Sequence, residues 1–199
     1  EREWDAAAVY TQNLVYGAPI RVTRNNIADG KAYGVICNSG MANTCNADGV
    51  EKAEMMCKLV ADATNLKPTD FVVASTGVIG QPINIEPIEN GMAQLVNELS
   101  EDGSDDAAQA IMTTDTVKKE FAVSFDLGGK ECKIGAISKG SGMIHPNMAT
   151  MLGFITTDAN ISGEMLKKAL LEVVKDSFNM LSVDGDTSTN DTVAVLASG

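Results

Sequence analysis

The sequence predicts an α+β (mixed α/β) fold whose sheet is mixed or antiparallel. Short apolar runs typical of buried strands alternate along the chain with longer segments in which apolar residues recur every three or four positions, as on one face of a helix. The turn Asp126-Leu127-Gly128-Gly129 lies between two strand-like runs and indicates a β-hairpin. Because the strands of a hairpin are antiparallel, this signal argues against a doubly wound parallel sheet.

The first half of the chain is expected to alternate strands with helices. We predict strands over residues 32–38 and 71–75, and amphipathic helices over 49–65, 82–99 and 105–112. Small residues follow each strand, Asn38-Ser39-Gly40 after the first and Thr76-Gly77 after the second. Such clusters are typical of turns, so both strands are predicted to end there.

The second half is expected to be richer in strands. We predict the hairpin over 121–125 and 130–138, a strand over 153–157, a helix from about 163 to 181, and a last strand over 193–197. Ser162 is a good N-cap for the long helix, since its hydroxyl can accept an orphan backbone N–H.

Composition narrows the classes of function. The chain has 199 residues and a net charge of −12, which argues against nucleic acid, whose partners need a basic surface. An anionic metabolite would need a local cation, and Lys139, in a glycine-rich stretch, is a candidate. The four cysteines have no metal-ligand spacing and His145 is the single histidine, so we predict no metal site. No apolar run approaches the roughly 20 residues of a membrane span. We therefore expect a cytoplasmic protein with free thiols and no membrane partner.

Two glycine-bearing segments invite a functional interpretation. The segment 75–80 follows a buried strand, where small residues can leave backbone N–H groups pointing into a cavity, as in an oxyanion hole. A simple turn that needs glycine is the alternative interpretation. The segment 139–147 contains Gly140-Ser141-Gly142 beside a lysine, but it matches neither a dinucleotide-binding nor a P-loop pattern.

Thr150 stands in the sequence Met148-Ala149-Thr150-Met151. A threonine hydroxyl needs a base to become a nucleophile, and cutting the peptide bond before it frees an α-amine that can serve as that base. Ala149 is small enough to let the hydroxyl reach the preceding carbonyl. His145 is the other conceivable base, although a loop with a proline gives that hypothesis no geometric support. The acidic segment 184–191 fails the calcium-loop pattern and is better explained as a hydrogen-bonded Asx/Ser-Thr turn.

Together these segments resemble the ornithine acetyltransferase (glutamate N-acetyltransferase) family. The matching segments occur in the family's order, at similar spacing and over nearly the whole chain: 38–43, 76–80, 111–116, 139–144, 146–151, 177–179 and 183–191. The resemblance implies a layered helix–sheet sandwich of the ornithine acetyltransferase/aminopeptidase type. Members of the family are roughly twice as long as this chain, so it looks like a partial copy.

The resemblance also implies a self-cleaving precursor. The bond cut would be Ala149–Thr150, so residues 1–149 form an α-chain-like portion and 150–199 the start of a β-chain-like portion. The two portions would make one domain, incomplete here, in an α2β2 heterotetramer.

By the same resemblance, the reaction is acetyl transfer from N-acetylornithine to glutamate in arginine biosynthesis. Thr150 would be the nucleophile, Thr76 and Gly77 the oxyanion hole, and Thr113 and Lys139 substrate-binding residues, together with Thr150. No metal or organic cofactor is implied, although some members accept acetyl-CoA as a substrate. Two alternatives stay open: an N-terminal-nucleophile amidohydrolase or aminopeptidase, and an inactive fragment.

Overall fold

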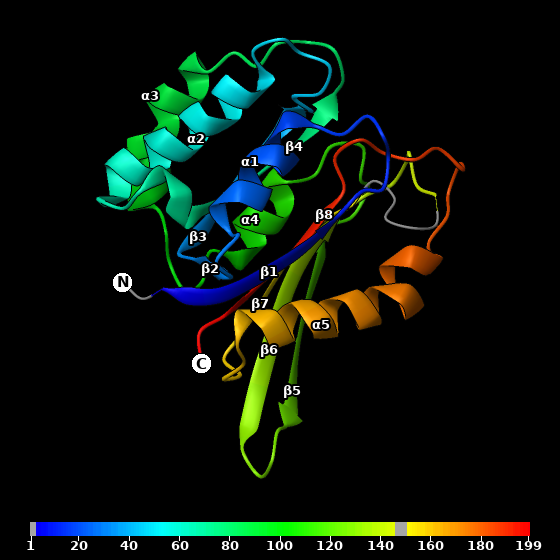
Figure 1. Cartoon of the computed structure of the whole chain (residues 1–199). Helices are drawn as coiled ribbons and strands as arrows, with labels where there is room; N and C mark the ends of the chain where they lie inside the picture. The colour runs from blue at the N-terminus through cyan, green and yellow to red at the C-terminus, as the bar shows by residue number, and fades with distance from the viewer. Residues whose placement is uncertain (1–2, 146–150) are drawn as a thin grey trace.

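The computed structural model describes residues 3–145 and 151–199 (Figure 1). In chain order the elements are β1 (Trp4–Tyr10), α1 (Ala18–Asn26), β2 (Lys31–Ala32), β3 (Gly34–Met41), α2 (Gly49–Thr64), η1 (Pro68–Asp70), β4 (Phe71–Val78), α3 (Glu86–Asn97), α4 (Ser104–Ala110), β5 (Lys119–Asp126), β6 (Glu131–Lys139), β7 (Leu152–Thr157), α5 (Gly163–Val173), η2 (Val174–Asp176), η3 (Phe178–Met180) and β8 (Thr192–Ala197), where η marks a 3-10 helix. None of the helices within these two ranges is long and apolar enough to span a bilayer.

Two sheets form the centre of the molecule. The larger has six strands in the order β2-β1-β8-β7-β6-β5, and the smaller is the pair β3-β4. Within the six-stranded sheet only β7 and β8 run parallel, while β3 and β4 are parallel to each other. The predicted hairpin forms β5 and β6, in antiparallel register from Lys119↔Ser138 to Asp126↔Glu131. The prediction of a mixed sheet is confirmed.

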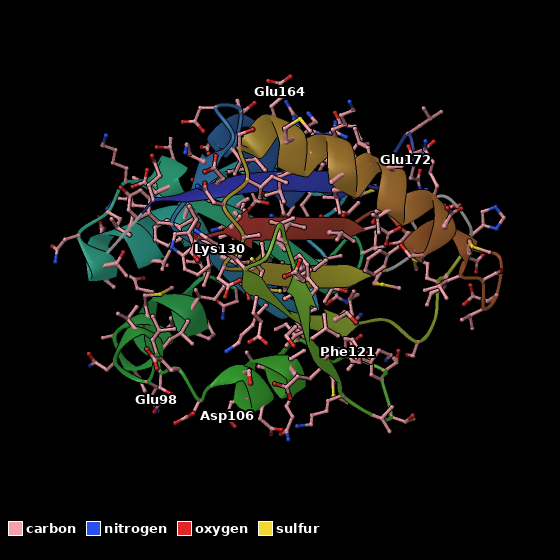
Figure 2. All side chains as sticks on the ribbon, turned by 90° about the horizontal axis from the view of Figure 1, so that it is seen from below. Glu98, Asp106, Phe121, Lys130, Glu164 and Glu172 are labelled. Atoms are coloured by element: carbon pink, nitrogen blue, oxygen red, sulfur yellow. The ribbon has the colours of Figure 1, made fainter. Side chains whose placement is uncertain are left out.

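The elements stack in layers: α5, then the six-stranded sheet, then the smaller sheet, and then the remaining helices that cover it. Along β1, Ala7 and Val9 pack with Leu166 and Leu170 of α5, whereas Ala6 and Ala8 face the smaller sheet. This alternation is the period-2 pattern of a strand buried on both faces. Figure 1 shows α5 on one side of the molecule and α2 and α3 on the other. In Figure 2 α5 lies along the six-stranded sheet, with the exposed Glu164 and Glu172 on this helix.

The smaller sheet is buried between the larger sheet and the helices. In β4, Val72 and Ala74 face the six-stranded sheet, and Phe71 and Val73 face the core shared with α2 and α3. The outer edge of β4 is closed by α1. Thr23 is fully buried, and its hydroxyl donates to the carbonyl of Val73 at 2.6 Å and accepts its N–H at 2.8 Å. The Thr23 side chain thereby supplies to Val73 the two hydrogen bonds that a neighbouring strand would otherwise make.

Several predicted boundaries were wrong. The strand predicted over 32–38 is divided, because Ala32 ends β2, which pairs with β1, and β3 begins at Gly34. β3 and the strand predicted over 71–75 run on to Met41 and Val78, because their parallel pairing continues through Gly40↔Gly77. The helix predicted over 82–99 spans only Glu86–Asn97, since Asn84 accepts the N–H of Glu86 and ends the preceding loop. The helix capped by Ser162 stops at Val173 and continues as the 3-10 helices η2 and η3.

Candidate active site

Strand ends from both sheets meet at one end of the sandwich. Lys139, the last residue of β6, pairs with Leu152, the first of β7, and Leu152 also pairs with Thr192, the first of β8. From the smaller sheet, β3 and β4 end together at Met41 and Val78. Side chains from five strand ends can therefore reach one place.

A cavity of about 630 Å³ lies at this end of the molecule. Its lining residues are mostly small or hydroxyl-bearing: Ser39, Gly40, Ala42, Thr76, Gly77, Val78, Ile79, Met112, Thr113, Thr114, Lys139, Gly142, Met143, Ser188, Thr189 and Asn190. The structure thus brings together four residues that the sequence analysis singled out, Thr76, Gly77, Thr113 and Lys139. Their roles remain predictions.

Lys139 is the cation of this cavity. It is only 3% exposed, and its Nζ donates to Thr113 Oγ1 at 2.7 Å and to Thr76 Oγ1 at 3.1 Å. Burial lowers the pKa of Lys139, and the nearby negative charge of Asp115 opposes that shift. The ammonium group therefore joins two hydroxyls at the wall of the cavity, in a protein whose net charge is strongly negative.

Asp115 holds the turn that follows Lys139, a role that the sequence analysis missed. Its carboxylate accepts the Lys119 ammonium at 2.6 Å, the Gly140 N–H at 2.8 Å and the Thr113 N–H at 3.4 Å. Burial acts to raise the pKa of Asp115, but these hydrogen bonds together lower it below its usual value. The carboxylate thereby ties the loop that carries Thr113 to the end of β6.

Gly77 has a backbone that only glycine adopts readily. Its φ is +121°, and a Cβ at this position would overlap the backbone of Gly40 in β3. Thr76, beside it, is 5% exposed, and both line the cavity. The sequence analysis weighed an oxyanion hole against a simple turn here. The structure shows a distorted strand end within β4 rather than a turn.

Asn190 joins the two sheets beneath the cavity, a role that the sequence did not predict, although the residue lies in the matching segment 183–191. Its Nδ2 donates to the carbonyls of Ala42 and Ser75, and its Oδ1 accepts the hydroxyls of Thr44 and Thr189. Every polar atom of the amide is thus paired, and the ends of β3 and β4 are tied to the residues before β8.

The acidic segment 184–191 accepts backbone N–H groups. Asp184 accepts those of Met143 at 2.6 Å and Ile144 at 2.9 Å, and also that of Asp186, as in an Asx turn. These bonds lower the pKa of Asp184, with the N–H of Met143 contributing most. The segment therefore anchors the loop that leads toward Thr150.

Asp191 is a second buried carboxyl group in this region, in addition to Asp115. It is 1% exposed, and its Oδ1 accepts the N–H of Met151 at 2.8 Å. Burial raises the pKa of Asp191 to about 7, and the N–H of Met151, the hydroxyl of Ser188 and the charge of Lys139 offset only part of that shift.

The predicted nucleophile Thr150 and the predicted cleavage bond Ala149–Thr150 lie outside the described residues. The chain is described again from Met151, whose carbonyl accepts the N–H of Thr192 at the start of β8. His145, the other conceivable base, is exposed.

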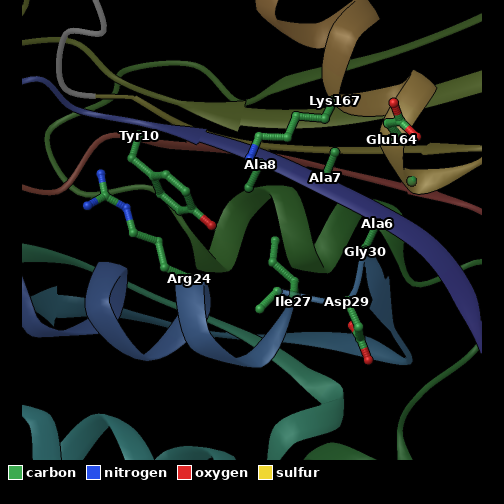
Figure 3. Close-up of a pocket in the computed structure, with 12 residues that line it drawn as sticks. Ala6, Ala7, Ala8, Tyr10, Arg24, Ile27, Asp29, Gly30, Glu164 and Lys167 are labelled. Atoms are coloured by element: carbon green, nitrogen blue, oxygen red, sulfur yellow. The ribbon is translucent and has the colours of Figure 1, made fainter.

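A second cavity, of about 250 Å³, lies between β1, α1 and α5 (Figure 3). Arg24 stacks over the ring of Tyr10 at 4.9 Å there, and Lys167 and Glu164 line the same space. The charged groups have both signs and are exposed. This cavity lacks the buried cation and the cluster of serine and threonine hydroxyls of the first, which is therefore the candidate active site.

The whole sequence also matches a known protein family. The model of the ArgJ family matches residues 1–199. The arginine biosynthesis bifunctional protein ArgJ of Symbiobacterium thermophilum is 51% identical over 195 residues, which are 98% of this chain and 48% of that protein. The chain spans about half the length of the curated relatives it matches.

Two solved structures are similar in fold and in sequence. The arginine biosynthesis bifunctional protein ArgJ of Bacillus halodurans is 36% identical with a TM-score of 0.64, over 75% of this chain and 85% of that one. The ornithine acetyltransferase of Mycobacterium tuberculosis, solved in complex with ornithine, is 32% identical with a TM-score of 0.62, over 71% of this chain and 77% of that one. Both support the mixed layered fold described above.

Proposed function

This chain belongs to the ArgJ family, and from that premise we propose that it is the acetyl-carrying part of a glutamate N-acetyltransferase. The enzyme would move an acetyl group from N-acetylornithine to glutamate. The observation that carries the proposal is the buried ammonium of Lys139, which joins Thr76 and Thr113 at one cavity. The relative solved with ornithine supports a substrate of this class.

The cavity suits acyl transfer through a hydroxyl nucleophile. Thr150 Oγ would attack the acetyl carbonyl, while the hydroxyl of Thr76 and the backbone N–H of Gly77 stabilise the oxyanion. Because Thr76 Oγ1 accepts its hydrogen bond from Lys139, its own proton is free to be donated to that oxyanion. Ornithine then leaves with the proton as the C–N bond breaks, and the amine of glutamate takes the acetyl group from the threonine ester.

Lys139 and Thr113 are assigned to substrate binding. Glutamate and ornithine both carry carboxylates, and a charge-assisted hydrogen bond from a buried ammonium is among the stronger ways to hold one. The partners in this proposal are N-acetylornithine and glutamate. An assay of acetylglutamate formation also tests acetyl-CoA as a further acetyl donor. The chemistry needs no metal or organic cofactor, since the acetyl group moves by addition and elimination alone.

Self-cleavage at Ala149–Thr150 belongs to the same proposal. Residues 1–149 supply β1 to β6 and residues 150–199 supply β7 and β8, yet all eight strands form one layered unit. The two portions would therefore stay together as one domain after the cut, as α and β chains of an α2β2 assembly.

A cytoplasmic location is also proposed, because all four cysteines are free thiols.

The test is the change Thr150→Ala in the protein expressed from its whole gene. Without the hydroxyl we expect neither cleavage nor acetyl transfer, and thus a rate at least about 10³-fold lower. Denaturing mass spectrometry reports the cut, and formation of acetylglutamate from N-acetylornithine reports the transfer. Thr64→Ala is the control, since that hydroxyl donates to the carbonyls of Val60 and Ala61 within its own helix, α2.

The outcomes separate the alternatives. Two fragments that meet at Ala149 and Thr150, with acetylglutamate formed, support the proposal. Acetate release without acetylglutamate would point to an amidohydrolase instead. One intact mass with no turnover would point to an inactive fragment. Cleavage or transfer that survives Thr150→Ala would refute the nucleophile assignment.

A further inference from the structure

One buried carboxylate holds the backbone on both sides of the contact between Lys139 and Thr113. The side chain of Asp115 is fully buried. Its Oδ1 accepts the N–H of Gly140, the residue after Lys139, at 2.8 Å, and its Oδ2 accepts the N–H of Thr113 at 3.4 Å. Because Lys139 Nζ donates to Thr113 Oγ1 at 2.7 Å, these hydrogen bonds close a ring. Moving Asp115 would therefore displace both residues assigned to substrate binding.

The segment that carries Thr113 lies outside regular secondary structure. Residues 111–118 form neither a helix nor a strand. The hairpin brings the end of this segment beside the end of β6, through the antiparallel pair Lys119↔Ser138. The position of Thr113 in the cavity thus depends on side-chain contacts across this junction, and the Asp115 carboxylate supplies a buried one.

We propose that Asp115 is a positioning residue, which holds the ammonium of Lys139 and the hydroxyl of Thr113 as one site for a substrate carboxylate. The inference rests on the proposed function. Asp115 is not one of the described residues that line the cavity, and its carboxylate binds the Lys119 ammonium at 2.6 Å. The ion pair offsets a negative charge that would otherwise repel an anionic substrate. Asp115 acts through its neighbours rather than on the substrate.

The charge of Asp115 also favours the ammonium form of Lys139. Burial lowers the pKa of Lys139, and Asp115 is foremost among the charges that oppose this shift. Cys37 on β3 and Asp191 before β8 act in the same direction as Asp115, whereas Lys119 acts against it. Burial raises the pKa of Cys37 to about 12, so this thiol stays neutral where an ordinary lysine titrates, near about pH 10. The two partners of one ion pair therefore have opposite effects on Lys139.

Two substitutions at this ion pair separate charge from shape. Asp115→Asn keeps the shape and can still accept the Gly140 N–H, but it removes the negative charge. Lys119→Gln can still donate to Asp115, but it removes the positive charge. A substrate carboxylate needs the charged form of Lys139. The alkaline limb of the kcat/KM profile for glutamate should therefore move down in Asp115→Asn and up in Lys119→Gln, each by about one pH unit.

Binding should suffer more than turnover in Asp115→Asn. The Thr113 N–H loses its charged acceptor, so the substrate site is held less firmly while the proposed oxyanion hole keeps its residues. We expect KM for glutamate at neutral pH to rise about 10-fold, with kcat changed by less than about 3-fold.

The experiment uses the protein from its whole gene in four forms: wild type, Asp115→Asn, Lys119→Gln and Asp158→Asn. Asp158→Asn is the matched control, because this carboxylate also accepts a backbone N–H of β6, that of Lys133 at 2.6 Å, but toward the other end of the strand. Steady-state kinetics at varied glutamate and pH gives kcat and KM separately, and circular dichroism checks folding. The amine of glutamate titrates equally in all four forms, so it cancels in their comparison.

Opposite movements of the alkaline limb in Asp115→Asn and Lys119→Gln, with Asp158→Asn unchanged, support the proposal. Movements in the same direction, an equal shift in Asp158→Asn, or a folded Asp115→Asn with the wild-type profile and KM overturn it. If Asp115→Asn does not fold, Lys119→Gln decides alone: an upward movement supports the proposal, and no movement overturns it. If the wild type forms no acetylglutamate, the proposed function fails, which is a different result from these.

Discussion

At the scale of single residues, the cavity is organised by a few buried polar side chains rather than by many contacts. Lys139 binds two hydroxyls, Asp115 holds the turn beside it, and Asn190 satisfies all its amide atoms against both sheets. Buried polar groups that are fully paired specify one arrangement, because any other leaves a donor or acceptor without a partner. The geometry of the cavity thus depends on these side chains.

The first residue-scale prediction concerns Lys139. In Lys139→Met the hydroxyls of Thr76 and Thr113 lose their donor and the proposed carboxylate site loses its cation. A hydrogen bond to a charged group contributes about 1.5–3 kcal/mol, so kcat/KM for glutamate should fall roughly 10- to 100-fold. Steady-state kinetics measures it. Lys130→Met, in the exposed hairpin turn labelled in Figure 2, is the control and should leave kinetics unchanged.

At the scale of elements, the smaller sheet has only two strands, and a helix closes one of its edges. Thr23 of α1 pairs both the N–H and the carbonyl of Val73 in β4. An isolated pair of strands is marginally stable in water, so it needs both this closure and the two layers around it. The end of β4, where Thr76 and Gly77 line the cavity, depends on that support.

The element-scale prediction is therefore Thr23→Val. The shape is kept but two buried groups of Val73 lose their partner, so we expect the free energy of unfolding to fall by about 2–4 kcal/mol. Urea unfolding followed by circular dichroism measures it. Thr64→Val is the control and should cost less than about 1 kcal/mol, because the Thr64 hydroxyl donates to the carbonyls of Val60 and Ala61 within its own helix. Equal losses in the two variants would contradict this explanation of the β4 edge.

At the scale of the whole molecule, the two portions on either side of residue 150 form one sheet. Strand β7 lies between β6, which precedes it across the predicted cut, and β8, which follows it. Hydrogen bonds and apolar packing both cross that boundary, through the register Lys139↔Leu152 and the core around Phe154. Stability is therefore a property of the combined unit.

The whole-molecule prediction concerns pH and uses the uncut Thr150→Ala protein. Burial raises the pKa of Asp191 from 3.8 to about 7, so between these values the unfolded chain loses a proton that the folded one keeps. Stability from this group is thus complete below about pH 4 and is lost as pH rises to about 7. The loss is at most about 4 kcal/mol, at about 1.4 kcal/mol per pKa unit.

Adding Asp191→Asn to the Thr150→Ala protein should remove this dependence of the free energy of unfolding on pH. Urea unfolding between pH 4.5 and pH 8 tests it. Asp184→Asn should act in the opposite direction. Hydrogen bonds lower the pKa of Asp184, so its contribution is present above its ordinary pKa and is lost as pH falls. Parallel pH profiles with and without Asp191 would contradict the assignment of a raised pKa.

Local patterns in the sequence were sufficient for part of the fold. The helix over Gly49–Thr64, the hairpin of β5 and β6, and the Ser162 N-cap were predicted, because periodicity, turn chemistry and capping are properties of neighbouring residues. No prediction was made for β1 or α1. Their burial comes from distant partners, β8 and α5 for the former and the edge of β4 for the latter.

For the site, the sequence by itself determined the candidate residues Thr76, Gly77, Thr113 and Lys139 through their resemblance to a family, and it determined Thr150 as the predicted nucleophile. Only the tertiary structure decided that the first four line one cavity, and that Asp115, Asn190 and Asp191 support it. Besides near neighbours in the chain, these residues have partners that lie 25 to 148 residues away, as in Gly140 for Asp115 and Ala42 for Asn190. Hydrogen bonds over such separations depend on which strands become neighbours, and no local pattern encodes that.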